Sequence, residues 1–196
     1  MMNTIIYLIR HGDSPKTGEV ERLRGLSGKG QAGAERVTEL LKDEGIDVFV
    51  SSPYKRAVLT IEELASLSGK DVLLYEELKE RMFSSGVNRM ADAELYPLLE
   101  KSFKDPHYSL PGAESNAGCQ VRAVEVIKEL LSRYQGRKIA VGTHGAVMTL
   151  ILQHFDERVG LDFLLGTSKP DIYKLTFDGE ELIEVERLWD PVPRTS

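Results

Sequence analysis

The sequence predicts an α/β protein, a three-layer α/β/α sandwich with a mostly parallel central sheet and an antiparallel hairpin at its C-terminal edge. Two observations favour this class. Short apolar, β-branched runs alternate with segments of helical periodicity along most of the chain, and such alternation is typical of crossover units with parallel strands. Near the C-terminus, two alternating runs flank Asp178-Gly179, a pattern typical of a β-hairpin.

The first half of the chain supplies three of the expected strands. Thr4–Ile9 is a continuous apolar run, which is typical of a parallel strand buried on both faces. Ser27–Glu44 predicts a helix because its apolar residues recur at helical spacing. Two shorter strands are expected at Val48–Ser51 and Val72–Tyr75, and the helix between them is expected to have Pro53 in its first turn.

The second half continues the alternation before it changes character. Ser115–Tyr134 predicts a long helix, Lys138–Gly142 a strand, and Ala146–His154 a helix behind that strand. The two strands of the final hairpin are expected at Ile172–Phe177 and Glu181–Leu188.

Residues 81–114 are the least regular part of the sequence. Three prolines and two glycines interrupt them, and a short helix is expected near Asp92–Phe103. Because the chain of 196 residues contains no repeat or linker-like stretch, we expect one domain over 1–196 that carries 81–114 as a small cap-like insertion.

The composition narrows the function before any motif is considered. A net charge of −6 argues against a nucleic-acid binder, which needs a broad basic surface. The N-terminal apolar run ends at Arg10, too short for a signal-peptide core or a membrane helix. The single cysteine excludes an internal disulfide. These observations favour a cytoplasmic protein without a membrane partner, and they leave its oligomeric state open.

Chemically active residues gather at the ends of three expected strands. Arg10-His11-Gly12 follows the first strand, Ser51-Ser52-Pro53 with Arg56 follows the second, and Thr143-His144-Gly145 follows the strand at 138–142. Ligands of open α/β sheets bind beyond the carboxyl ends of the strands. Each histidine or arginine alone has an ordinary explanation as a hydrogen-bonded loop residue or a solvated helix residue. Their shared position predicts one site, where Gly12 and Gly145 would let the backbone approach a ligand.

These motifs carry a resemblance to a known family. The chain resembles the histidine phosphatase superfamily, which includes the cofactor-dependent phosphoglycerate mutases, over about residues 4–155. The matching segments follow the family's order: Arg10-His11-Gly12-Asp13-Ser14; Leu26-Ser27 with Gly30-Gln31-Ala32; Ser51-Ser52-Pro53 with Arg56-Ala57 and Thr60; Leu78-Lys79-Glu80; Pro111-Gly112-Ala113-Glu114-Ser115; and Thr143-His144-Gly145.

The resemblance implies a nucleophilic histidine and a set of cationic partners. His11 is expected to attack phosphorus through Nε2, with its Nδ1–H bonded to a backbone carbonyl. Arg10 and Arg56 suit the phosphate oxygens, and His144, protonated beside the dianion, would add a donor. The helix beginning near Ala146 is expected to offer free N–H groups at the same place. No metal or cofactor is expected, because the basic side chains take over the role of a metal ion.

The proton donor for the leaving oxygen has two candidates. Glu80 matches the family position of the acid, although it lies in a charged run that could simply be solvated. Asp13 competes with it because it lies next to the signature, where many relatives carry Glu. The resemblance leaves both open.

The substrate contacts are predicted less sharply than the reacting groups. Gly12, Gly145 and Ala146 are expected beside the phosphate, and Ser14, Arg24 and Gly25 stand where relatives contact the phosphorylated substrate.

Two departures from the family pattern leave the substrate unidentified. Lys16-Thr17 replaces a usual Asn, and the loop Pro15–Leu26 is short and lacks the family's Trp-Asn. Arg81, Arg89 and Lys104 are expected to be exposed rather than to bind anionic groups.

The expected activity is hydrolysis of a small phosphomonoester through a phosphohistidine. It would make the chain a metal-independent, histidine acid phosphatase-type enzyme. A cofactor-dependent phosphoglycerate mutase is the first alternative, but the region 81–114 offers little room for a large lid. A non-catalytic phosphate-binding protein on the same fold is the second, and the four intact positions Arg10, His11, Arg56 and His144 argue against it.

Overall fold

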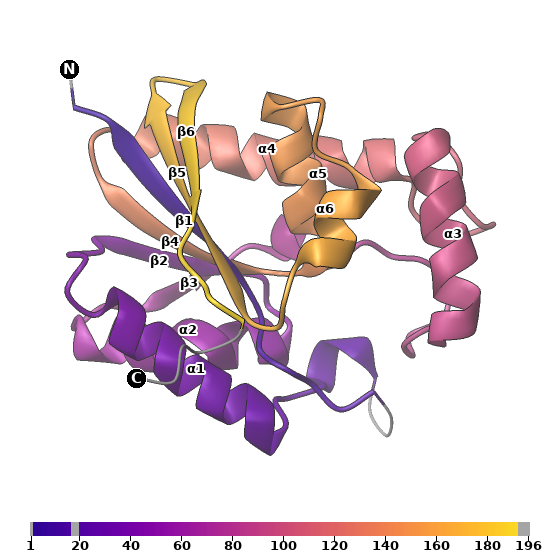
Figure 1. Ribbon diagram of the computed structural model, residues 1–196, viewed down its shortest axis with the longest axis horizontal. Helices are drawn as coiled ribbons and strands as arrows, with labels where there is room; N and C mark the ends of the chain where they lie inside the picture. Colours follow the sequence, from indigo (N-terminus) through magenta and orange to yellow (C-terminus); the bar gives the residue numbers. More distant parts are fainter. Residues whose placement is uncertain (1, 17–19, 192–196) are drawn as a thin grey trace.

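A computed structural model describes residues 2–16 and 20–191 of the chain. Its centre is a six-stranded sheet in the order β3-β2-β4-β1-β5-β6, in which the first four strands are parallel and the last two antiparallel (Figure 1). The predicted mostly parallel sheet with an antiparallel edge hairpin is confirmed. The strands are β1 (Thr4–Arg10), β2 (Val48–Ser51), β3 (Val72–Leu74), β4 (Lys138–Thr143), β5 (Asp171–Asp178) and β6 (Glu181–Arg187).

Helices cover both faces of this sheet, as the predicted three-layer sandwich requires. α1 and α2 lie on one face, and α4 and α5 lie on the other (Figure 1). The helices are α1 (Gly28–Leu41), α2 (Lys55–Leu67), α3 (Asp92–Lys104), α4 (Asn116–Arg133), α5 (Gly145–Phe155) and α6 (Leu161–Gly166), and single turns lie at Glu21–Leu23 and Glu76–Leu78.

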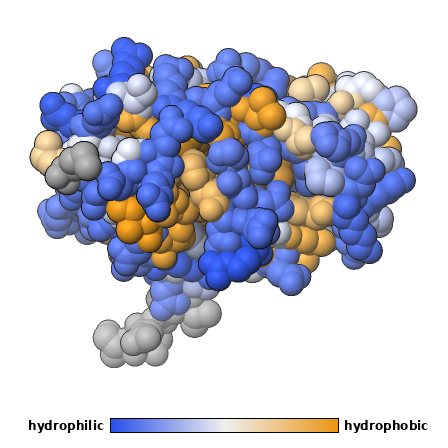
Figure 2. All heavy atoms as spheres, turned by 90° about the horizontal axis from the view of Figure 1, so that it is seen from above, coloured by the Kyte–Doolittle hydropathy of each residue, from blue (hydrophilic) through white to orange (hydrophobic). Residues whose placement is uncertain are grey.

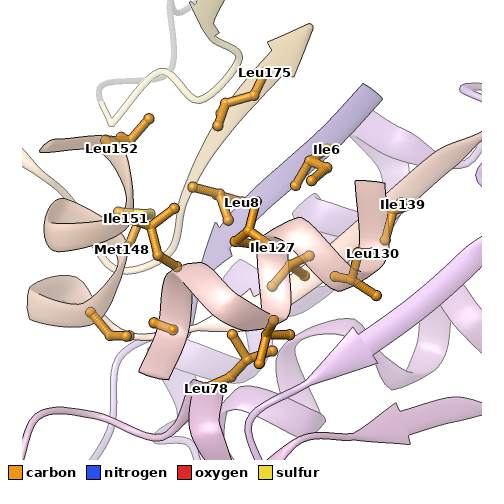
Figure 3. Packing of buried hydrophobic residues seen from close by; sticks show 14 of the residues in the cluster. Ile6, Leu8, Leu78, Ile127, Leu130, Ile139, Met148, Ile151, Leu152 and Leu175 are labelled. Carbon is orange, nitrogen blue, oxygen red and sulfur yellow. The ribbon is translucent and has the colours of Figure 1, made fainter. Parts of the chain in front are cut away.

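The alternation of side chains along β1 shows why its sequence is apolar at every position. Ile6 and Leu8 point toward α4 and α5, where Ile127 and Met148 pack against them (Figure 3). The intervening residues Tyr7 and Ile9 belong to the core on the α1 and α2 side. Successive strand residues face opposite sides, so a strand covered on both faces needs an unbroken apolar run.

The structure differs most from the predictions at the boundaries of two helices and in one additional helix. α1 ends at Leu41, three residues before the expected end at Glu44. α2 begins at Lys55, so Pro53 precedes the helix instead of lying in its first turn. The short helix α6 was not predicted, because a six-residue helix offers too little periodicity to recognise.

The 81–114 segment lies at the end of the molecule where the parallel strands finish. Its helix α3 packs through Leu99 against Ala146 of α5 and Leu164 of α6, in a small apolar cluster separate from the main cores. Hydrophilic side chains dominate the face drawn in Figure 2, and the hydrophobic ones form small patches. Among the described residues, no helix combines the length and apolar character that crossing a membrane requires.

Candidate active site

The sheet register brings the two predicted histidines together. β1 and β4 are parallel neighbours in which Arg10 pairs with Thr143, so His11 and His144 each follow the last residue of adjacent strands. Their ring centroids lie 5.2 Å apart. β2 flanks β4 on the other side and leads into α2, which carries Arg56. Three segments distant in sequence thus meet at one edge of the sheet.

The hydrogen bonds of His11 determine which ring nitrogen carries the proton. Nδ1 lies 2.7 Å from the carbonyl oxygen of Gly12, which can only accept, so Nδ1 is the protonated nitrogen. Nε2 accepts a hydrogen bond from Arg56 Nε at 3.2 Å. The lone pair of the imidazole is therefore at Nε2, as the sequence predicts.

The surroundings of His11 also keep its imidazole neutral. Burial, followed by the positive charges of Arg56 and Arg10, lowers its pKa well below the usual range. A neutral imidazole retains the lone pair that a nucleophile needs. The lone pair at Nε2 is therefore present without a separate base to remove a proton.

His144 is buried more deeply and is less fully hydrogen-bonded. Its Nε2 lies 2.8 Å from Ser52 Oγ, and its buried Nδ1 has no hydrogen-bond partner among the described residues. Burial, then the charges of Arg56 and His11, lowers its pKa well below the usual range. The imidazole is neutral here, so the protonated His144 expected from the sequence would have to form together with a bound dianion.

The two arginines are held differently. Arg56 is 2% exposed, and its NH2 forms an ion pair with Glu21 Oε2 at 2.8 Å. The same carboxylate oxygen lies 3.0 Å from Arg24 NH2, so Glu21 bridges both guanidinium groups. Arg10 instead donates to Thr167 Oγ1, and its buried Nε has no partner among the described residues.

Glu80 occupies the N-terminus of α5. Its carboxylate accepts hydrogen bonds from the backbone N–H groups of Ala146 at 3.1 Å, Val147 at 3.0 Å and Arg81 at 2.8 Å. The expectation that the first N–H groups of this helix are free for phosphate is therefore wrong, because a side chain already caps them. Glu80 also lines the cavity above His11.

Arg122 holds the segment that carries Glu80. Its guanidinium donates to the backbone carbonyls of Glu77, Lys79 and Glu80 and pairs with Glu114 at 2.6 Å. Asp13, the other acid candidate, accepts from Ser27 Oγ at 2.6 Å, at the N-cap of α1, and is not part of the cavity lining.

A cavity of about 500 Å³ opens above His11, Arg10 and Arg56. Of the six predicted substrate-binding residues, Ser14 and Arg24 line it. Four do not form its wall: Gly12, Gly25, Gly145 and Ala146.

The two glycines after the histidines are required for packing against protein groups rather than against a ligand. A Cβ at Gly12 would lie 2.8 Å from the Gly30 carbonyl oxygen, and one at Gly145 would lie 2.7 Å from the Arg10 guanidinium. Gly12 and Gly145 were predicted to let the backbone approach a ligand. The structure shows instead that the missing side chain makes room for the Gly30 carbonyl and the Arg10 guanidinium.

Several residues that line the cavity were not predicted to belong to the site. Glu21 lies in a charged loop, and Lys169 lies far away in sequence just before β5. Arg81, expected to be exposed, is 2% exposed, and Arg89, also expected at the surface, lines the cavity. The motifs on which the family resemblance was recognised end near residue 155, so they could not have indicated Lys169. Glu21 could have been suspected, because arginines close to Arg10-His11-Gly12 need a carboxylate partner.

Comparison with known proteins agrees with this geometry. An "uncharacterized phosphatase PhoE" of Bacillus subtilis is 26% identical over 154 residues, 76% of each chain. A 2,3-bisphosphoglycerate-dependent phosphoglycerate mutase of Corynebacterium kroppenstedtii is 27% identical over 222 residues, covering 91% of this chain and 89% of the mutase. The solved structure of a mycobacterial glucosyl-3-phosphoglycerate phosphatase shares the fold, with a TM-score of 0.76 at 17% identity over 94% of this chain and 97% of that one.

The match to a whole family is broader than any of these pairs. The sequence profile of the histidine phosphatase superfamily, branch 1, matches residues 6–189, which include His11, His144, Arg10 and Arg56. The chain is a member of the histidine phosphatase superfamily, an enzyme family of phosphatases and mutases.

Proposed function

We propose that this protein hydrolyses a small phosphomonoester through a phosphohistidine on His11. One observation carries the proposal: Nε2 of a buried, neutral His11 holds a lone pair beside the Arg56 guanidinium, with Arg10 in the same cavity. A phosphoryl group needs a nucleophile and fixed positive charge around its equatorial oxygens. Both are within the same wall of the cavity.

The reaction takes place in two balanced steps. In the first, Nε2 forms a bond to phosphorus as the ester P–O bond breaks, and the leaving oxygen becomes an alcohol by taking a proton from the Glu80 carboxyl group, which must enter this step protonated. In the second, Glu80 takes a proton from water, whose oxygen attacks phosphorus and breaks the P–N bond. The products are the alcohol and inorganic phosphate, and both His11 and Glu80 return to their first state.

Binding the phosphoryl group rearranges the resting contacts. Arg56 Nε donates to Nε2 at 3.2 Å, and this bond must be given up before Nε2 can attack. The phosphate oxygens would replace both Nε2 and the Glu21 carboxylate as acceptors for Arg56. Nδ1 of His144, which has no hydrogen-bond partner among the described residues, would donate to a further phosphate oxygen once the dianion favours its protonation, which requires the phosphoryl group to reach past the cavity lining to this buried ring.

Glu80 is the better candidate for the acid. It lies in the cavity wall with His11, whereas the Asp13 carboxylate is engaged with Ser27 outside it. To act, Glu80 must release at least one of its three backbone hydrogen bonds.

We further propose that the basic side chains replace a metal ion in neutralising the charge of the phosphoryl group. Residues 81–114 are proposed to form a cap over the cavity of a single domain. The protein is also proposed to be cytoplasmic, since its one cysteine excludes an internal disulfide.

The mutase alternative is supported by the relative from Corynebacterium kroppenstedtii. A mutase returns the phosphoryl group to another oxygen of its substrate, so it must exclude water from the intermediate. The phosphatase relative and the small 81–114 segment favour hydrolysis.

The experiment is to incubate the protein with 3-phosphoglycerate and 2,3-bisphosphoglycerate, with p-nitrophenyl phosphate as a general substrate, and to measure inorganic phosphate and 2-phosphoglycerate. We expect phosphate release. Efficient isomerisation without net phosphate release would establish the mutase, and a folded protein without any turnover would favour the non-catalytic alternative.

A further inference from the structure

The cavity holds more positive charge than one phosphoryl group requires. Nine lysines and arginines line it against two glutamates, in a chain whose net charge is −6. Concentrating cations in a concave site raises the local concentration of anions. The question is which of these cations remain available to a ligand.

Six of the nine cations already have a carboxylate partner. Glu21 pairs with two of them, Glu76 with two more, and Asp92 with the last two. The six are Arg24, Arg56, Arg22, Lys79, Lys16 and Arg89.

Three cations of the cavity form no ion pair within the described part of the chain. Arg10 is assigned to the transferred phosphoryl group. Arg81 is buried and donates to the Glu114 carbonyl and to Ser102 Oγ. The third is Lys169, whose ammonium makes neither a hydrogen bond nor an ion pair with any residue that the structure describes.

The sheet places Lys169 at the edge of the reacting groups. β5 is antiparallel to β1, and Asp171 pairs with Arg10, so the chain just before β5 lies alongside the turn that follows His11. Lys169 is half-buried in the cavity wall. Burial first, then the charges of Arg10, Arg89 and Lys16, lowers its pKa to about 8. A cation accepts such a position at a cost in free energy, which a bound anion would offset.

Two of those neighbours share a single counter-ion. Asp92 lies 2.8 Å from Lys16 and 2.5 Å from Arg89, through separate oxygens. Asp13 is a second negative charge near Lys169, but it forms no ion pair with Lys169 in the part of the chain that the structure describes. Lys16, Arg89 and Lys169 therefore carry three positive charges against the two carboxylates of Asp92 and Asp13, and they come from three segments: the loop after β1, the 81–114 segment and the loop before β5. One further anionic group would balance this cluster better than the resting protein does.

We propose that Lys169, Arg89 and Lys16 form a second anion subsite, which binds a carboxylate or second phosphate carried by the same molecule as the phosphate that His11 attacks. The subsite rests on the proposed phosphatase function, and it names the substrate class: a phosphomonoester with a second anionic group rather than a neutral sugar or alcohol phosphate. Lys169 is its specificity-determining residue because it alone of the three has no carboxylate partner among the described residues.

A matched pair of ligands tests the subsite. Glycerol 3-phosphate and 3-phosphoglycerate differ in a hydroxymethyl group against a carboxylate, and both can be measured as competitive inhibitors of p-nitrophenyl phosphate hydrolysis. The inhibition constant of 3-phosphoglycerate is expected to be at least about tenfold lower than that of glycerol 3-phosphate, in line with a charge-assisted hydrogen bond. Lys169→Met is expected to remove most of this ratio, and Lys169→Arg to retain it. Lys70→Met, at an exposed lysine outside the cavity, is the matched control and is expected to leave the ratio unchanged.

The outcomes separate this inference from the proposed function. Absence of p-nitrophenyl phosphate hydrolysis by the parent protein would contradict the phosphatase itself. With hydrolysis present, equal inhibition constants for the two ligands would overturn the subsite. A loss in Lys169→Met that is the same for both ligands would overturn it too, since Lys169 would then contact the transferred phosphate. Should Lys169→Met fail to fold, Lys169→Gln and the ratio in the parent protein decide.

Discussion

The floor of the cavity and the 81–114 segment above it are built on opposite principles. The floor joins His11, which follows β1, to Arg56 of α2, and both line the cavity. His144, which follows β4, does not line the cavity but contacts His11, and all three side chains are nearly or fully buried. Residues 82–90 have no regular structure, and Val87 in this stretch is 67% exposed although apolar. The comparison teaches that the proposed reacting groups are fixed by the sheet, whereas Arg89 of the proposed anion subsite lies on a loop that can vary without disturbing the sheet.

Glu80 directly precedes the 81–114 segment and caps the N-terminus of α5. Its substitution is expected to have the largest effect on activity. Glu80→Gln keeps the shape of the side chain but removes the acid, so kcat for a substrate with a poor leaving group should fall about 100-fold, within the range for a general acid. The loss should be much smaller for p-nitrophenyl phosphate, whose leaving group needs little protonation. Rates of phosphate release for the two substrates measure this difference.

Asp13→Asn is the matched control, because this carboxylate lies outside the cavity wall. Its expected loss is below about threefold for both substrates. A larger loss in Asp13→Asn than in Glu80→Gln would contradict the assignment, and Asp13 would then be the proton donor instead of Glu80.

The burial of His11 and His144 predicts a smaller effect, which concerns the pH dependence of the free energy of unfolding. The folded-state pKa values of His11 and His144 are lowered, whereas histidines of an unfolded chain titrate near about 6.5. Below that pH the unfolded state binds protons that the folded state does not, so the free energy of unfolding should fall as the pH decreases. Urea unfolding of the parent, His11→Asn and His144→Asn proteins between about pH 7.5 and pH 5.5 measures the slope, which each substitution should reduce. Parallel slopes in all three proteins would show that the floor is solvated.

The residues of the cavity floor were predicted from the sequence more accurately than those of the 81–114 segment, and the reason is physical. Apolar runs of a buried parallel sheet are legible, and parallel strands align their carboxyl ends, so His11 and His144 could be placed together from their position after two strands. The boundaries of β2 and β4 were likewise close to those expected.

Contacts that depend on the tertiary arrangement are not marked by any local pattern in the sequence. Lys169 reaches the cavity because β5 returns antiparallel beside β1, and no local pattern marks a lone lysine before a strand. Glu21 is one charge in a charged loop until the fold places it between Arg24 and Arg56. Arg81 was expected in solvent because that is the common state of arginine, but the fold buries it within the 81–114 segment, where it donates to Ser102 Oγ and the Glu114 carbonyl.

The central claim is that His11 carries the phosphoryl group during turnover. A radiolabelled phosphomonoester is mixed with the protein, the reaction is stopped in alkaline denaturant, which preserves phosphohistidine, and the labelled peptide is identified by mass spectrometry. We expect acid-labile phosphate on the peptide that contains His11, no label in His11→Asn, and activity of that variant at least about a thousandfold below the parent. Continued turnover with no phosphate on His11, or equal activity in the two proteins, would contradict the account.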